Sequence, residues 1–150
     1  MLTRVIINGF FGLCVFLAGA TVVNATDLGV SPVRVTLSDK QKMGTLTVRN
    51  NGAEPVPMQL EVLNWSQEEG NDVFTPTREL IVNPPIFTIP AGGSQLIRVG
   101  LRRAPDAQRE LIYRIFLQEL PPPPSPEFNG TKMLMRVSLP VFVLPKVAAK

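Results

Sequence analysis

The chain has 150 residues, of which 45% are hydrophobic, and this is enough for one domain with a buried core. It carries 15 basic and 12 acidic residues, and a net charge of only +3 gives no reason to expect nucleic acid as a partner. Histidine is absent and Cys14 is the single cysteine, so the usual general base, the common nucleophile arrangements and the metal ligands other than carboxylates are missing. We therefore expect no enzymatic activity, no metal and no cofactor.

Residues 1–25 have the features of a secretory signal peptide. A basic start with Arg4 leads into an apolar stretch, Phe10–Leu17, and the segment Val23–Ala25 fits the small-residue rule for cleavage. Ala18–Ala20 offers a second cleavage point, and an uncleaved anchor is the alternative interpretation. After cleavage no cysteine remains, so the exported protein has no disulfide and only its core can stabilise the fold. No apolar run is long enough to cross a membrane.

After the signal, short β-type runs alternate with clusters of Gly, Pro and Asn at spacings of about ten residues. Pro32 interrupts the first run, which should therefore lie at an edge or switch between sheets. A stiff proline-rich connector, Pro121–Pro126, separates the last two runs. The absence of helical periodicity predicts an all-β fold, an immunoglobulin-like seven-stranded β-sandwich. In chain order, the expected strands cover Leu28–Leu37, Thr45–Arg49, Val56–Val62, Leu80–Ile89, Leu96–Arg102, Glu110–Leu120 and Thr131–Leu144.

The last run has one fully apolar face, on which alternation places Met133, Met135, Val137 and Leu139. One interpretation is an ordinary sandwich strand that turns this face to its own core. The other is an edge strand offered to a partner, because a long apolar edge is otherwise an aggregation hazard.

Several segments resemble the periplasmic pilus-assembly chaperones, the PapD-like family. Glu110–Pro122 looks like the family's sixth strand, and Asn83–Gly92 with Gln95–Val99 resembles the segment before it. Gly29–Val35 is similar to the family's first strand and carries its basic residue at Arg34. The matching segments occur in the family's order over residues 28–145, which makes the resemblance specific.

The resemblance implies a non-enzymatic periplasmic chaperone with two immunoglobulin-like domains, of which residues 26–145 form the first. Such a chaperone lends its seventh strand to a pilin subunit that lacks its own, needs no nucleotide, and passes the subunit to an outer-membrane usher. Arg34 would hold the terminal carboxylate of the subunit. Val33 and Val35 flank this arginine on the opposite face of the strand, so if these two side chains point into the core, Arg34 must point outward toward the cleft. The side chains that would fill the subunit groove are Met133, Met135, Val137 and Leu139.

The sequence departs from the family pattern in two places. Better known members have a seventh-strand lysine where Pro140 stands, so the chain looks like the divergent branch that lacks it. Arg98 and Arg114, both on non-core faces, are candidates for the second cation. Residues 146–150 would begin the interdomain linker, and we expect the second domain to be absent.

Two other classes of protein remain open. A secreted structural sandwich could polymerise through its own last strand, like a pilin, although no spare donor segment is evident near the mature N-terminus. A carbohydrate-binding adhesive module would display exposed aromatic side chains, and Trp65 and Phe128 are the candidates.

Overall fold

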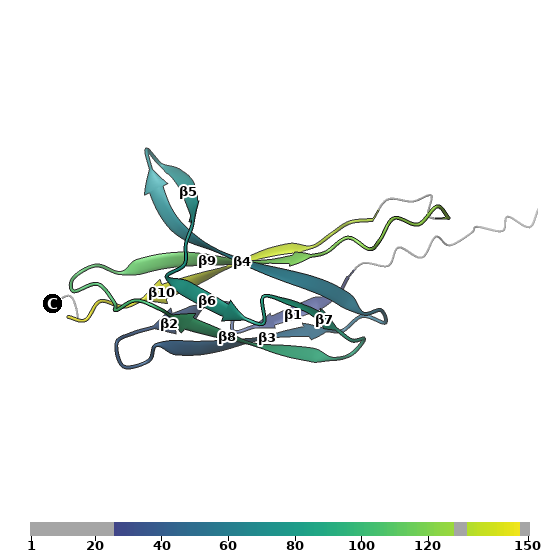
Figure 1. Cartoon of the computed structure of the whole chain (residues 1–150), viewed down its shortest axis with the longest axis horizontal. Coiled ribbons are helices and arrows are strands. Elements are labelled where there is room, and N and C mark those ends of the chain that lie inside the picture. Colours follow the sequence, from purple (N-terminus) through teal and green to yellow (C-terminus); the bar gives the residue numbers. More distant parts are fainter. Residues whose placement is uncertain (1–25, 128–131, 148–150) are drawn as a thin grey trace, which may run out of the picture.

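The chain folds as an all-β sandwich of two sheets (Figure 1). A computed structural model describes residues 26–127 and 132–147, which form ten strands and no helix. The four-stranded sheet has, in spatial order, β1 (Leu28–Ser31), β3 (Met43–Asn50), β8 (Ser94–Leu101) and β6 (Leu80–Asn83). The six-stranded sheet has, in order, β2 (Val35–Leu37), β10 (Arg136–Val143), β9 (Leu111–Glu119), β4 (Val56–Glu68) and β5 (Asn71–Pro76), with β7 (Ile86–Ile89) also pairing with β4. The predicted immunoglobulin-like sandwich is confirmed.

The first predicted run switches between the sheets, as Pro32 indicates. β1 pairs with β3 in the four-stranded sheet, whereas β2 pairs in parallel with β10 in the six-stranded sheet. The condition that Val33 points into the core is not met, because this residue is 69% exposed in the link between the two strands. Val35, the first residue of β2, is buried as expected.

The fourth predicted run also divides between the sheets. β6 pairs with β8, and β7 pairs with β4 on the opposite sheet. The segment Pro84–Pro85 separates the two strands, since proline has no N–H to donate to a ladder.

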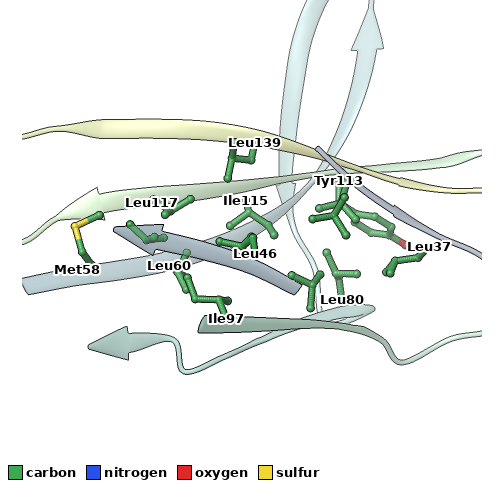
Figure 2. Close-up of a cluster of buried hydrophobic side chains, with 14 of the residues drawn as sticks. Leu37, Leu46, Met58, Leu60, Leu80, Ile97, Tyr113, Ile115, Leu117 and Leu139 are labelled. Atoms are coloured by element: carbon green, nitrogen blue, oxygen red, sulfur yellow. The ribbon is translucent and has the colours of Figure 1, made fainter. Parts of the chain in front are cut away.

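Alternating side chains of both sheets fill the space between them. Leu46 and Ile97 come from the four-stranded sheet, and Leu60, Ile115 and Leu117 come from the six-stranded sheet; all belong to one buried cluster (Figure 2). Because the inward residues alternate with outward ones, each sheet keeps a second face that its own core does not use.

The β4–β5 hairpin projects from the sandwich near the top of Figure 1. β4 is 13 residues long and continues past the core, and its turn places Glu69 and Gly70 at φ values of 51° and 81°. Two central residues with positive φ are typical of the tight turn that joins twisted antiparallel strands. β5 is not among the strands that the sequence predicts.

The β9–β10 hairpin extends from the other end of the sheet, at the right of Figure 1. β10 begins at Arg136 and not at Thr131, and Thr131 lies outside the described residues, as does the predicted signal peptide. Within the described parts of the chain, no helix is long and apolar enough to cross a membrane.

Candidate interaction site

Half of β10 has a free edge. β10 pairs with β9 along its whole length, from Arg136 to Val143, but β2 covers its other side only at Val141–Val143. Along residues 136–140, no strand of the described chain lies on the side away from β9. The backbone groups on that side are thus free to pair with an added strand.

The four predicted groove-filling side chains lie in different surroundings along this hairpin. Met133 is 85% exposed and Met135 is half-buried, and both precede the first residue of β10. Val137 is half-buried against the core, and Leu139 is only 4% exposed. The expectation for Leu139 needs correction, because its side chain belongs to the domain's own core.

Arg34 and Arg114 lie on opposite sides of Pro140. Pro140 is paired with Arg114 of β9, and the parallel register that pairs Val141 with Val35 sets Arg34 beside Pro140 on the other side. Neighbouring strands are about 4.8 Å apart, so the two arginine backbones are separated by roughly 10 Å. Pro140 is therefore flanked by two arginine residues, one on each side in the sheet.

Arg98 lies elsewhere. It is an exposed residue of β8, in register with Thr45 and Asn83 on the four-stranded sheet. Its neighbours Ile97 and Val99 are fully buried, so its side chain leaves the outer face of that sheet. The structure brings Arg34 and Arg114 together on one face and keeps Arg98 on the other.

The outer face of the six-stranded sheet carries arginine side chains stacked on aromatic rings. The Cζ atom of Arg114 lies 4.1 Å from the ring centroid of Trp65, and that of Arg136 lies 4.4 Å from the centroid of Phe116. Phe74 of β5 packs edge-on against Phe116, with the centroids 5.4 Å apart. Together with Arg34, whose Cζ is 6.0 Å from the centroid of Phe142, these residues form what we call the arginine–aromatic face.

Sequence reasoning found part of this face and missed the rest. Alternation placed Arg114 on a non-core face, but Phe74 belongs to the unpredicted β5. The turn residues Glu69 and Gly70 were the available signal for that strand.

Stacking orients these cations without neutralising them, because an aromatic ring face offers a quadrupole and no countercharge. Arg136 has a carboxylate within reach, with its Nη2 atom 3.9 Å from Oε2 of Glu61. Arg34 and Arg114 form no ion pair with any described residue, and the buried Nε of Arg114 finds no acceptor among them. The two arginines beside Pro140 thus retain donors for an external anion.

Hydrogen bonds to Asp72 hold the projecting hairpin together near its tip, one residue pair from the end of the β4–β5 ladder. Gln67 Nε2 and Trp65 Nε1 donate to Oδ1 of Asp72 at 3.1 Å and 3.0 Å. These two bonds, that of Gln67 first, hold the pKa of Asp72 below its usual value. Since Arg114 covers its ring, the half-buried Trp65 is a poor platform for a sugar; Phe128 lies outside the described residues.

The described residues contain no cluster of three or more His, Cys, Asp or Glu side chains that could hold a metal ion. What the site presents is a free strand edge, the exposed Met133 beside the half-buried Met135, and a cationic face. These are the elements of protein recognition by strand pairing.

Comparison with known proteins gives the same family as the sequence segments. The family of pili and flagellar-assembly chaperones, PapD N-terminal domain, matches residues 27–149. None of the curated protein sequences matches the chain.

Solved structures of chaperones share the fold. A chain of the CsuC–CsuE chaperone–tip adhesion subunit pre-assembly complex, from archaic chaperone-usher Csu pili of Acinetobacter baumannii, is 26% identical with a TM-score of 0.69, over 80% of this chain and 52% of that one. The E. coli chaperone DraB is 24% identical with a TM-score of 0.63, over 83% and 58% of the two chains. A chain of the Salmonella enterica SafA pilin–SafB chaperone complex is 17% identical with a TM-score of 0.67, over 85% and 58%.

The chain spans a little over half the length of these solved proteins. The family match covers most of the chain, and the resemblance seen in the sequence segments is confirmed. The chain belongs to the family of pili and flagellar-assembly chaperones and carries their PapD N-terminal domain.

Proposed function

We propose that this domain binds pilus subunits in the periplasm by adding its β10 edge to the subunit, and that the protein then delivers the subunit to an outer-membrane usher. The observation that carries the proposal is the free edge of β10 over residues 136–140, beside Arg34. Membership of the chaperone family and the subunit-bound chaperones among the similar structures support it. Usher delivery rests on the family alone.

In this proposal, backbone hydrogen bonds along residues 136–140 supply the generic affinity. Met133 and Met135 enter the groove of the subunit, and Val137 keeps the register by packing on the domain's own core. Full burial of an exposed methionine contributes roughly 1.5–3 kcal/mol before the cost of association is subtracted. Two methionines make a modest contribution, so the backbone pairing and the charged anchor must provide the rest.

The anchor is the carboxyl end of the subunit, held between Arg34 and Arg114. A guanidinium group presents two parallel donors that match the two oxygens of a carboxylate. The absence of ion-pair partners for both arginines among the described residues supports this role. Pro140 between them has no N–H and no charge, so it does not compete for the anion.

Co-purification from a bacterial periplasm tests the proposal. The full chain is co-expressed with a pilin encoded beside it, and we expect a one-to-one complex that keeps the pilin soluble. As a control, the same pilin with a short peptide added to its carboxyl end no longer presents its carboxylate at the native position and should be recovered in lower yield. Failure of the chain to retain any pilin would contradict the proposal.

A further inference from the structure

Glu119, the last residue of β9, has a buried carboxylate, with only 2% of the side chain exposed. Thr26 Oγ1 donates to its Oε2 atom at 3.1 Å, and the backbone N–H of Met135 donates to the same oxygen at 3.3 Å. The nearest described cation is Nζ of Lys132, which lies 3.8 Å from Oε1 and belongs to a side chain that is 44% exposed. A buried carboxylate is stable when it has a close cation and several donors, and this one has donors but only a distant, solvated cation.

The same carboxylate lies at the root of the hairpin that presents Met133 and Met135. The backbone N–H of Glu119 donates to the carbonyl of Met135 at 2.9 Å, so backbone and side chain of Glu119 both hold Met135. Immediately afterwards the chain leaves the sheet at Leu120 and enters the exposed prolines. The order of the methionine-bearing segment thus depends on how firmly Glu119 is held.

Thr26 donates a hydrogen bond to the carboxylate of Glu119. Cleavage after Ala25 would make Thr26 the first residue of the mature chain. In that reaction, water adds across the Ala25–Thr26 peptide bond, so that Ala25 leaves as a carboxylate and the nitrogen of Thr26 becomes an α-ammonium group. Only Cα and Cβ separate this nitrogen from the hydroxyl that already touches Glu119. Cleavage would therefore create a cation within reach of the buried carboxylate.

We propose that Glu119 is a binding site for the α-ammonium group of the mature chain. Removal of the signal peptide would thus add an ion pair where the Met133–Met135 segment joins the β9–β10 ladder. The inference rests on the proposed export and β10 donation. Its consequence is an order of events: Glu119 lacks the ammonium group in the precursor, and in the processed protein the ammonium group holds Glu119, and through it Met135, more firmly. A charge-assisted hydrogen bond forms only after export, where pilus subunits are encountered.

The first measurement is the mass of the product recovered from the periplasm, which should begin at Thr26. A product that begins at Thr21, after the alternative Ala18–Ala20 site, or one that keeps its signal would overturn the inference, because no ammonium would then lie at Glu119.

The second measurement compares the chain that begins at Thr26 with two versions of it, one bearing a single added glycine before Thr26 and one acetylated on its α-amino group. Loss of the charge-assisted bond should raise the unfolding equilibrium constant roughly ten-fold in both versions, and should speed hydrogen exchange of the Met135 amide by a similar factor. In Glu119→Gln, the three chains should be equally stable, whereas Lys132→Met should preserve the differences. Equal stability of the three wild-type chains would overturn the inference, even if Glu119→Gln failed to fold. All of these measurements use the chain without pilin, so their results test the inference even if the chain fails to capture pilin.

Discussion

Arg34 and Arg114 are the residues on which recognition depends most in our proposal. Each lies over an aromatic ring, Phe142 for Arg34 and Trp65 for Arg114, and neither forms an ion pair with a described residue, although the charge of Arg114 helps to lower the pKa of Asp72. An oriented cation loses little side-chain entropy when it binds an anion, because the stack has already restricted its rotamers. The pair is thus prepared for a carboxylate before the subunit arrives.

Replacing Arg34 tests this role. Arg34→Ala should leave the domain folded and weaken pilin binding at least about thirty-fold, since removing one partner of a partly desolvated pair costs about 2–5 kcal/mol. Arg34→Lys should restore binding only in part, because lysine lacks the two parallel donors. Affinity is measured on co-purified material, with circular dichroism as the folding control. Arg98→Ala, an exposed arginine on the other sheet, is the matched control, and an equal loss in that variant would contradict the assignment.

Met135 and Leu139 share one side of the hairpin but should respond differently to the same substitution. Met135→Ser should weaken pilin capture and lower the free energy of unfolding by less than about 1 kcal/mol, because the side chain is only half-buried. Leu139→Ser removes a core side chain and should cost at least the roughly 2–5 kcal/mol typical of Leu→Ala. Urea unfolding measures both. A large destabilisation by Met135→Ser would show that Met135 serves the core and not a partner.

At the level of the strands, the length of β2 determines how much of β10 stays free. β2 has only three residues, and the chain before it is occupied by Pro32, which cannot donate to a ladder, and by the exposed Val33. β2 therefore covers β10 only at Val141–Val143 and leaves the preceding half open. The interruption that the sequence shows at Pro32 is the cause of the free edge.

The tight contact between β2 and β3 can be probed at Gly44. A Cβ atom at this position would lie 2.8 Å from Cγ1 of Val35 and 3.4 Å from Cδ2 of Leu37, and both of these side chains are buried. Val35 is β-branched and cannot turn aside easily, so Gly44→Ala should destabilise the domain by about 1–3 kcal/mol. In Gly29→Ala, the nearest atoms are at 3.8 Å and 4.0 Å, and stability should be unchanged or slightly higher. Equal melting temperatures of the two variants would contradict this packing.

Alternation and turn signals predicted most strands, including the sheet switch at Pro32, because these are local features of the sequence. They failed where the burial of a side chain depends on which strand pairs with its own or on which sheet covers it. Alternation placed Met133 and Leu139 on one face, but only the sheet order reveals that core covers Leu139 while Met133 extends beyond it. In the same way, Arg98 and Arg114 look alike in sequence, and only the strand pairing separates them.

For the whole molecule, the buried Tyr113 makes the stability of the sandwich depend on pH. The hydroxyl of Tyr113 donates to Oε2 of Glu79 at 2.6 Å, and Arg103 Nη1 lies 2.8 Å from the other oxygen. The hydrogen bond from Tyr113, followed by that from Arg103, outweighs burial and holds the pKa of Glu79 below its usual 4.5. Burial, together with Glu79, raises the pKa of Tyr113 well above 10.

Because the folded-state pKa of Glu79 is depressed, its stabilising contribution is present above pH 4.5 and is lost as the pH falls through the folded value. Tyr113→Phe should therefore lower the free energy of unfolding by about 1 kcal/mol near neutral pH, a value reduced by the partial exposure of Glu79. The difference from wild type should shrink in acid. Urea unfolding from about pH 7 down to pH 3 measures it, and a difference that stays constant over this range would rule out the linkage.

Hydrogen exchange of the complete chain, free and bound to its pilin, tests subunit capture at β10 most directly. We predict that the amides of residues 136–140 that face away from β9 exchange at least about ten-fold more slowly in the complex, because an added strand pairs with them. The outward amides of β6, which is also an edge strand, serve as the internal comparison and should be unchanged. Protection at β6 with unchanged exchange along residues 136–140 would contradict the proposal that β10 is the strand offered to the subunit.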